Sequence, residues 1–373
     1  MSCRTSALII AAVAYATLSG CTEGSTAPGS VNELPAFATI GGSVTATSLK
    51  VSGGRATAVN DRGTIAGWQE KANALFGAFV WTPATPRGTV GAATALTTLG
   101  SEAMAEGINA TGHIVGMSRS TSTGVRRAVL WSPVSGGYGA PLDLGTGPGV
   151  SGGFAWAISD FQNDSAHVVG STDYTATEQA LAWKVTLAGG AVTHSPGQLL
   201  GGLVPGQGSS ARAINASGQV VGYANVSAPT GFHNHAVRWT PTGTGWTIQE
   251  LRPNSLQSVA WGINGQGYIV GQDETRAWVR HPGGTVSLLP TLGGTFSAAY
   301  AINDAREIAG YSTTRAGQGR AVLWLPSGAG YVVKGLGKQA SGSGFALNEP
   351  TGGATELVGT ATRTAQATLW TVR

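Results

Sequence analysis

Short runs of small and apolar residues alternate with turn residues along almost the whole chain. Residues 297–324 show the pattern, because three such runs follow one another there as "SAAYAIN", "EIAGYS" and "RAVLW". Runs of about four to six residues that contain β-branched and aromatic side chains, separated by turn residues, are typical of β-strands. Outside the N-terminal segment no window keeps a helical period. The pattern therefore predicts an all-β protein made of short strands.

The same set of runs recurs seven times. The phrase "AINDAREIAG" (301–310) and its variants place an Asn position at 60, 109, 159 (a Ser), 215, 264, 303 and 348, at intervals of 39–56 residues. A second phrase such as "AVLW" (128–131) follows each copy, and a Leu-rich run such as "LTTLG" (96–100) completes the unit. Four strands per unit of about 40–50 residues are the signature of a β-propeller. We therefore expect seven four-stranded blades.

The two ends of the repeated region predict how the ring closes. The last copy stops after its third strand at "ATLWTVR" (367–373), and "SVTATSLKV" (43–51) precedes the first copy where a fourth strand belongs. We expect this N-terminal strand to complete the last blade, which removes exposed sheet edges. An open solenoid would carry polar caps instead. Residues 43–373 are therefore predicted to form one seven-repeat propeller.

Two residue types that recur in register are expected to be structural. The Asn residues start tight turns between the first and second strands, where a Gly three residues later adopts a positive φ. The Trp residues that end the third strands are expected to pack between adjacent blades. They are Trp81, Trp131, Trp183, Trp239, Trp324 and Trp370. The fifth copy has Arg280 at this place, and Trp278, two residues earlier, keeps the same strand face.

A variable position on the innermost strand is one candidate for ligand binding. It precedes the "AIN" phrase and is occupied by Thr57, Glu106, Trp156, Arg212, Trp261, Tyr300 and Phe345. The position is expected to share a strand face with the Ile two residues later, which favours packing between blades. Alternatively, its four aromatic members stack on sugars or apolar groups at the mouth of the central channel, and Trp156, Trp261 and Tyr300 are the candidate binding residues.

A second variable position precedes an Ala that all seven copies have on the third strand. It is mostly long and polar, and its candidates for ligand binding are Arg127, His235, Arg276 and Arg320. These side chains either hold a loop by hydrogen bonds, which is the interpretation we favour, or present donors to a ligand. The loops between the second and third strands vary most in length, so the face that carries them is the expected binding face.

The N-terminal segment predicts secretion and a lipid anchor. Residues 1–20 contain one Arg before an apolar run (7–17) that is too short to span a bilayer and has the plan of a secretory signal. The sequence "LSGC" (18–21) resembles the lipobox of bacterial lipoproteins. This resemblance implies cleavage before Cys21 and lipidation of its thiol. The alternative is an ordinary signal peptide with a cysteine nearby.

The residues after the lipobox suggest where the protein is displayed. Thr22 stands where lipoproteins retained at the inner membrane often have Asp, so the resemblance implies an outer-membrane or cell-surface location. Residues 21–42 would comprise the lipidated Cys21 and a flexible tether, because the segment is small, polar and interrupted by Pro. The expected partner of this end of the chain is outer-membrane lipid.

Charge and cysteine content argue against several classes of function. Only 11% of residues are charged, the net charge is +4, and no run of five Lys or Arg occurs, so nucleic-acid binding is not expected. The two cysteines are Cys3 and Cys21, so removal of residues 1–20 leaves neither an intramolecular disulfide nor a cysteine-based metal site. His233 and His235 have no third ligand nearby in the sequence. We expect a monomer without metal or cofactor.

The repeats resemble the HAF-repeat family of predicted bacterial extracellular proteins, which is named for a His-Ala-Phe signature. The signature position is "GAF" at 77–79 and "HAV" at 235–237, and no copy has the full triplet. The recurring "INxxGxIVG" and "AVLW" phrases carry the resemblance better, over residues 43–373. The resemblance implies a secreted repeat fold and no particular activity or ligand.

No catalytic motif accompanies the repeats. The sequence has no GxSxG, no HExxH and no phosphate-binding glycine fingerprint, and the 18 acidic residues are interpreted as scattered, with none in register. We therefore expect a lipid-anchored surface propeller that binds a glycan, peptide or partner protein. The alternative is an extracytoplasmic polysaccharide-active enzyme, a glycosidase or lyase, with its site at the central channel. A purely structural envelope protein is the third hypothesis.

Overall fold

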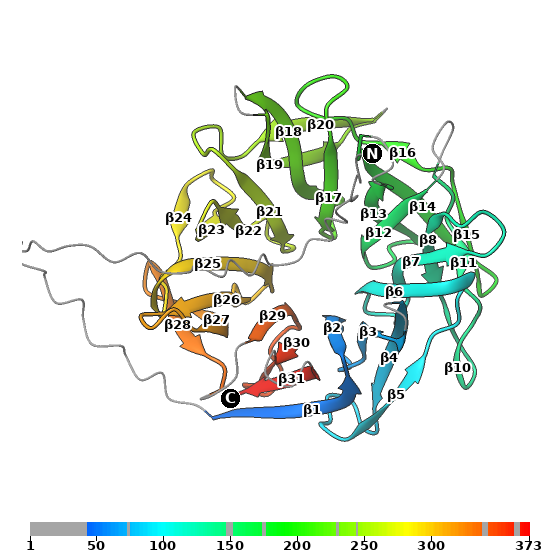
Figure 1. The fold of residues 1–373 in the computed structure, drawn as a ribbon, viewed down its shortest axis with the longest axis horizontal. Helices are drawn as coiled ribbons and strands as arrows, with labels where there is room; N and C mark the ends of the chain where they lie inside the picture. Colours follow the sequence, from blue (N-terminus) through cyan, green and yellow to red (C-terminus); the bar gives the residue numbers. More distant parts are fainter. Residues whose placement is uncertain are drawn as a thin grey trace, which may run out of the picture. The chain divides into compact units, whose positions relative to one another are not determined.

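Seven antiparallel sheets stand in a ring in the described part of the chain, so the fold is a seven-bladed β-propeller (Figure 1). The computed structural model describes residues 43–373 apart from 73–74, 147–151, 174–176, 229–230, 244, 338–341 and 362–365. The predicted signal peptide, lipidated Cys21 and tether lie outside these residues. Within the described segments no helix is long and apolar enough to cross a membrane. The predicted fold class is confirmed.

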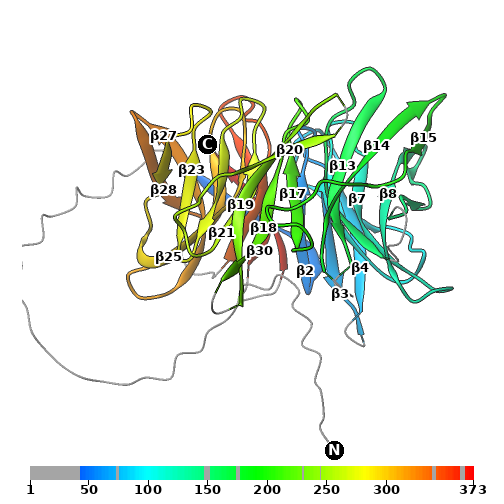
Figure 2. The same ribbon diagram turned by 90° about the horizontal axis from the view of Figure 1, so that it is seen from above.

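Each blade begins with its innermost strand and proceeds outward, and the sheets stand side by side (Figure 2). Blade 1 contains β2 (Gly54–Val59), β3 (Ile65–Glu70), β4 (Phe76–Pro83) and β5 (Gly91–Ala95). Blade 2 contains β6 (Gly100–Ile108), β7 (Ile114–Ser120), β8 (Arg126–Trp131) and β11 (Leu142–Asp143), with the small hairpin of β9 (Pro133–Val134) and β10 (Gly137–Tyr138). Blade 3 contains β12 (Gly153–Ile158), β13 (Ser165–Thr172) and β14 (Ala180–Ala188), and both β15 (Ala191–His194) and β16 (Gln198–Leu199) pair with β14.

The remaining blades follow the same order. Blade 4 contains β17 (Ser209–Ile214), β18 (Val220–Ala228), β19 (Gly231–Pro241) and β20 (Trp246–Glu250). Blade 5 contains β21 (Ser258–Ile263), β22 (Ile269–Asp273), β23 (Arg276–Arg280) and β24 (Val286–Leu288). Blade 6 contains β25 (Gly293–Ile302), β26 (Ile308–Thr314), β27 (Gly319–Ser327) and β28 (Gly330–Gly335). Blade 7 contains β29 (Gly342–Leu347), β30 (Thr355–Ala361), β31 (Gln366–Val372) and β1 (Val44–Ser52).

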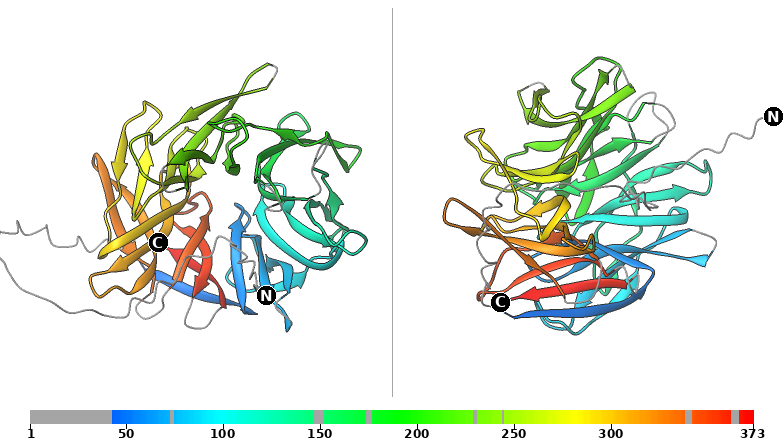
Figure 3. Two further views of the ribbon diagram at one scale, coloured as in Figure 1. Left: turned by 45° about the horizontal axis from the view of Figure 1, so that its top comes forward. Right: turned by 60° about the vertical axis from the view of Figure 1, so that its left-hand side comes forward.

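The N-terminal strand closes the ring as predicted. β1 runs antiparallel to β31 with Val44 opposite Val372, and Figure 3 shows the blue strand beside the red one in both views. Its far end also fills the space between blades 7 and 1, where Leu49 and Val51 are buried in one cluster with residues of both blades. Closure is therefore made by main-chain pairing and by apolar packing together.

Amide hydrogen bonds link the inner turns of neighbouring blades. The side-chain nitrogen of Asn264 donates to the main-chain oxygen of Asn303 at 2.9 Å, and its side-chain oxygen accepts the N–H of Tyr268, within its own turn. Six residues link blades in this way, and we call them the asparagine belt: Asn60, Asn109, Asn215, Asn264, Asn303 and Asn348. The third blade has Ser159 instead, whose hydroxyl accepts the N–H of His167 and has no amide to extend to the next blade.

The Trp residues of the third strands pack between blades, as predicted. Trp131 is fully buried in a cluster that combines blades 1 and 2, and its indole N–H donates to the main-chain oxygen of Thr97 in the connection from the preceding blade at 2.8 Å. Trp183, Trp239 and Trp324 donate in the same way to Gly145, Gly201 and Pro290. Trp278 is also fully buried, between blades 4 and 5. The indole rings therefore fill the space between adjacent blades.

Arg87 fastens blade 1 to blade 7 at the seam. It lies in the connection between β4 and β5, and its guanidinium donates four hydrogen bonds of 2.8–3.1 Å to blade 7. The acceptors are the main-chain oxygens of Glu349 and Ala354, the Thr351 hydroxyl and the Asn348 side-chain oxygen. Its Nε also lies 3.6 Å from the carboxylate of Glu356, which is nearly buried.

Replacing Arg87 should weaken the closed ring. We expect Arg87→Ala to lower the free energy of unfolding by about 2–4 kcal/mol, because it leaves several polar groups of blade 7 without their partner. Arg87→Lys should recover only part of this loss, since a lysine cannot reproduce the planar fork of donors. Urea denaturation followed by far-UV circular dichroism would measure both. Arg62→Ala, at an exposed residue of the same blade, is the control; equal stability of Arg87→Ala and Arg62→Ala would contradict the assignment.

Candidate functional site

Every innermost strand carries a β-bulge at the variable position that precedes the "AIN" phrase. In β2 the register passes from Ala56 opposite Gly67 to Ala58 opposite Ala66, so Thr57 is an extra residue on the inner strand. A bulge leaves such a residue out of the ladder and changes the direction of its side chain. The same shift occurs at Glu106, Trp156, Arg212, Trp261, Tyr300 and Phe345. We call these seven residues the channel ring.

A glycine stands opposite each bulge for a steric reason. A Cβ atom at Gly170 would lie 1.8 Å from the main-chain oxygen of Phe154, and one at Gly67 would lie 2.2 Å from that of Arg55. The other five positions meet the same obstacle at 1.9–2.1 Å: Gly116, Gly222, Gly271, Gly310 and Gly359. Because backbone blocks the space, only glycine allows the bulge there. The Gly that ends the repeated "IAG", "IVG", "VVG" or "LVG" phrase therefore permits the bulge that turns the channel ring residue out of the sheet.

The variable position was predicted to share a strand face with the Ile two residues later, on the basis of strict alternation. Ala155 and Ile158 lie in the same interblade cluster although they are three residues apart, and Ala157 lies in the next cluster. The bulge at Trp156 inserts one residue and so breaks the alternation. Trp156 itself packs against a second cluster of blades 2 and 3 that contains Met104, Met117 and Phe154.

Channel ring side chains contact one another across blade boundaries. The guanidinium carbon of Arg212 lies 4.3 Å from the ring centroid of Trp156 and 5.5 Å from that of Trp261. Ring centroids are 6.0 Å apart for Trp261 and Tyr300, and 5.5 Å apart for Tyr300 and Phe345. All of these side chains are half-buried. The predicted residues Trp156, Trp261 and Tyr300 therefore belong to one aromatic surface along the channel.

Three charged groups meet at the same level. Arg55, two residues before Thr57, places its guanidinium 3.7 Å from the ring centroid of Phe345. Glu106 of blade 2 interacts electrostatically with Arg55 of blade 1 and with Arg212 of blade 4, which is not its neighbour in the ring. Burial raises the pKa of Glu106 to about 7, and the two guanidinium groups and the Trp68 indole lower it only in part. A carboxyl group that titrates near neutral pH thus lies between two cations.

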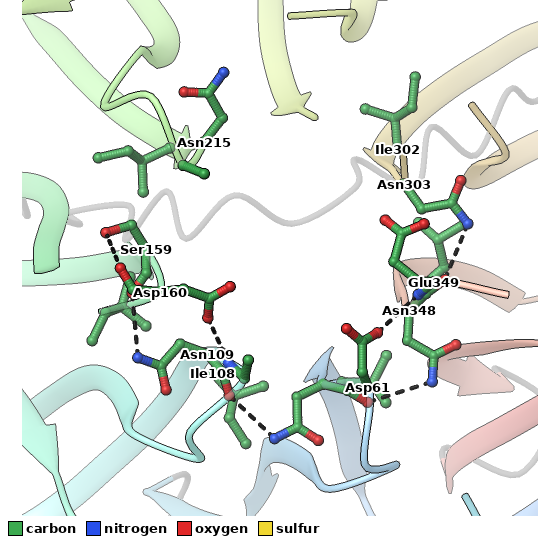
Figure 4. Close-up of a pocket in the computed structure, with 17 residues that line it drawn as sticks. Asp61, Ile108, Asn109, Ser159, Asp160, Asn215, Ile302, Asn303, Asn348 and Glu349 are labelled. Carbon is green, nitrogen blue, oxygen red and sulfur yellow. Dashed lines mark hydrogen bonds between the residues drawn. The ribbon is translucent and has the colours of Figure 1, made fainter. Parts of the chain in front are cut away.

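At the ends of the inner strands, the turns of the blades enclose a cavity of about 230 Å³ (Figure 4). The belt Asn is three residues beyond the channel ring position, or about 10 Å along an extended strand. The last strand residue and the belt position of six blades line this cavity; blade 2, for example, contributes Ile108 and Asn109. The cavity therefore opens at the turns between first and second strands, away from the loops between second and third strands.

Acidic residues recur in register at this cavity end, so the prediction that no acid does so is wrong. Asp61, Asp160, Asp304 and Glu349 each follow the belt position of their blade. Asp160 accepts the N–H of Ala110 at 2.7 Å from the preceding blade. The other three acids accept in the same way from Glu349, Gly265 and Asp304. These carboxylates therefore add a second set of links between blades, and among described residues no group of three His, Cys, Asp or Glu could hold a metal ion.

The polar residues predicted on the third strands lie apart from the channel ring. Each forms a hydrogen bond or ion pair within its own blade. The partners are Asp143 for Arg127 (2.9 Å), Glu250 for His235, the main-chain oxygen of Leu289 for Arg276 (3.2 Å) and Gln318 for Arg320 (2.8 Å). Such contacts agree with the loop-holding role favoured above. A ligand-binding role for these four residues stays a prediction.

Five residues of the channel were not predicted to bind a ligand: Arg55, Trp68, Glu106, Arg212 and Phe345. Glu106, Arg212 and Phe345 occupy the channel ring position, so the alignment of the repeats could have identified them as candidate binding residues. Arg55 and Trp68 face one another across β2 and β3, at positions where other blades have different residue types, such as Met104 and Met117 in blade 2. Only the fold shows that these two lie beside the channel ring.

No family model and no curated protein matches the sequence. Solved structures do resemble the fold. "YCF48 bound to D1 peptide" has 12% identity and a TM-score of 0.51, covering 88% of this chain and 96% of that chain. The β-propeller domain of the Trilobed protease from Pyrococcus furiosus, described with an open velcro topology, has 10% identity and a TM-score of 0.52 over 87% and 94%. YCF48 from Cyanidioschyzon merolae has 9% identity and a TM-score of 0.50 over 87% and 98%. At these identities the likeness concerns the fold alone.

Glu349 should oppose folding when it is ionised. Burial raises its pKa above the ordinary 4.5, although the N–H of Asp304 partly opposes this, and the charges of Asp304 and Asp61 raise it further. The Glu349 carboxyl therefore contributes most to stability when the pH lies below its ordinary pKa. This contribution is lost as the pH rises through the pKa that Glu349 has in the folded protein. Glu349→Gln keeps an acceptor for the Asp304 N–H and removes the charge, so we expect the Tm at pH 7 to rise by about 1–2 °C.

Thermal melts across pH test this expectation. The difference between Glu349→Gln and wild type should shrink as pH falls below the ordinary pKa. Glu70→Gln, at an exposed position of β3, should leave the Tm unchanged and is the control. A Glu349→Gln variant that melts below wild type at pH 7 would show that its hydrogen bonds outweigh the charge repulsion.

Proposed function

We propose that this chain is a lipid-anchored propeller of the bacterial cell envelope, a monomer of the HAF-repeat type that binds its ligand in the axial channel. The observation that carries the proposal is the channel ring. Its residues differ from blade to blade, whereas the Asn, Gly and Trp positions that build the ring are nearly uniform. The bulge gives every inner strand a variable side chain directed toward the channel, which is how a repeat scaffold displays a specific surface.

The channel ring supplies the groups that a ligand site needs. Trp156 already stacks on Phe154, with ring centroids 5.4 Å apart. Its remaining surface and the half-buried rings of Trp261, Tyr300 and Phe345 are available for sugar rings or apolar groups to stack on. The indole N–H of Trp261 is buried and has no hydrogen-bond partner among the described residues. Because a buried donor without a partner is costly, a ligand that accepts from it gains affinity there. The combination of apolar walls and a few polar groups is typical of ligand pockets.

A similar fold supports the general role without fixing the ligand. A YCF48 propeller is described with a bound D1 peptide, so a propeller of this kind can serve as a binding module. The enzyme hypothesis is favoured by one observation, the pKa of Glu106 near 7, which suits an acid–base catalyst. However, burial is the cause that raises this pKa, and the charged groups that act on Glu106 are two arginines, whereas a glycosidase needs a second carboxylate beside its acid. Burial raises the pKa of Tyr300 to about 12, which makes it a poor base. Binding is therefore the better supported function.

Substitutions in the channel ring should remove ligand binding without unfolding the ring. A glycan array and a peptide array of bacterial-envelope components would identify ligands, and calorimetry would give their Kd. We expect Trp156→Ala and Trp261→Ala each to raise the Kd by about tenfold or more, since each removes a large stacking surface. Phe232→Ala, at an aromatic residue that is 60% exposed outside the channel, should leave the Kd unchanged. A saturable ligand unaffected by both Trp variants would place the site elsewhere.

The anchor has a separate test, because its support is the apolar run (7–17) and the "LSGC" motif (18–21), which are independent of the channel. Mass spectrometry of the mature protein should show a lipidated N-terminal Cys21, and membrane fractionation should recover the protein with the outer membrane. Cys21→Ser should abolish the lipid mass and the membrane recovery, since no acyl chain then anchors the chain. Cys3→Ser, within the segment expected to be removed, should change neither. An unlipidated mature N-terminus in the wild type would contradict the anchor.

A further inference from the structure

We propose that the channel site recognises an anionic sugar, a sugar ring that bears a carboxylate or phosphate group, with the anion held between Arg55 and Arg212 in place of Glu106. This inference rests on the proposed function and adds the chemical class of the ligand. Guanidinium groups present planar forks of N–H donors that match both carboxylates and phosphates.

The charge of the site favours an anion. Two guanidinium groups face the Glu106 carboxyl, and Glu178 lies 4.0 Å from one of them, so the cluster carries a net positive charge while Glu106 is protonated. Among described residues no hydrogen bond is formed by the Arg55 guanidinium, which contacts the rings of Phe345 and Trp68 and interacts electrostatically with Glu106 and Tyr300. Burial lowers the pKa of Arg55 while Glu106 and Tyr300 oppose this shift. A half-buried guanidinium with unused donors is a ready site for a bidentate anion.

Arg212 is held in place for the same task. Its Nη2 lies 4.0 Å from the carboxylate of Glu178, and that carboxylate accepts a hydrogen bond of 2.6 Å from the hydroxyl of Tyr223. Glu178 lies in the connection between β13 and β14, which is one of the loops between second and third strands. The contact with Glu178 therefore orients the Arg212 guanidinium, and Glu106 is the charged group that interacts with Arg212 on the channel side.

The aromatic walls favour a sugar as the bearer of the anion. Each guanidinium lies against aromatic rings, Arg55 against Phe345 and Arg212 against Trp156 and Trp261. A sugar ring that stacks on such a wall would bring its anionic substituent to the adjacent guanidinium. An extended peptide would instead seek a regular strand edge, and every inner strand is bulged at this level. A peptide is therefore the less favoured ligand.

Displacement of Glu106 has a measurable consequence. The groups that face its carboxyl are Arg55 on β2, Arg212 on β17 and Trp68 on β3. A bound anion pairs with the two guanidinium groups in place of Glu106 and adds a negative charge nearby. Both changes raise the pKa of Glu106 above its value of about 7 in the free protein. Binding near pH 7 should then take up a fraction of one proton from solvent, and affinity should fall as pH rises above 7.

Calorimetry with defined sugars tests the proposal. The probes are a galacturonate trimer, the neutral galactose trimer of the same linkage, galactose 6-phosphate and an acidic peptide. We expect the galacturonate trimer or the phosphosugar to bind at least tenfold more tightly than the neutral trimer, and the stronger of the two identifies the anion. Arg55→Gln and Arg212→Gln should each raise the Kd about tenfold or more, whereas Arg238→Gln, on the third strand of blade 4, should not.

Proton counting separates an anion site from simple stacking. Titrations in buffers of different ionisation enthalpy should show proton uptake by wild type and none by Glu106→Gln, which should still bind the anionic sugar. Thermal melts confirm that each variant is folded. Equal affinity for neutral and anionic trimers, or uptake that persists in Glu106→Gln, would overturn the proposal. If only a neutral sugar or the acidic peptide binds and Trp156→Ala weakens it, the proposed binding function stands and this inference fails.

Discussion

Closure of the ring between blade 7 and blade 1 is the interaction on which the rest of the structure depends. β1 pairs with β31 along the outer edge, Leu49 and Val51 fill the space between the two blades, and Arg87 joins the inner turns. Adjacent blades fix the channel side chains relative to one another, so this seam also positions the site. The stacking of Arg55 from blade 1 on Phe345 from blade 7 crosses it directly. An open ring would therefore lose stability and the geometry of the channel together.

The repeated phrase combines shape with the means of displaying chemistry. Its Asn forms an interblade bond and closes its own turn, as Asn264 does with Asn303 and Tyr268. Its Gly removes the Cβ that would strike a main-chain oxygen, and so permits the bulge that turns the preceding strand's variable residue toward the channel. The phrase carries no reactive group. It nevertheless determines where functional side chains are displayed, because each copy presents a variable side chain at the same level of the channel.

The sequence was sufficient for the architecture and insufficient for the site. Repeat spacing, the Trp register and the missing fourth strand of the last copy predicted seven blades and their closure by residues 43–51. The direction of the channel ring could not be predicted from strict alternation, since a bulge shifts it by one residue and the Gly that permits the bulge lies on a different strand, as Gly67 does opposite Ala56. Arg55 and Trp68 have no counterparts of the same type in the other blades, so periodicity could not single them out.

The polarity of the channel argues against a purely structural role. A stable plug would be apolar, because buried ion pairs are often no better than well-packed hydrophobic residues and charged groups lose hydration when buried. This chain has only 11% charged residues, and it still places Arg55, Glu106 and Arg212 at one level of its channel. The asparagine belt and the carboxylates of the cavity end already link the blades, so the ring does not need these three groups for closure. Burial raises the pKa of Glu106 and lowers that of Arg55, which shows that both charged forms are held at a cost to stability. The proposed ligand, which would complete the arrangement, gives a physical reason for keeping them.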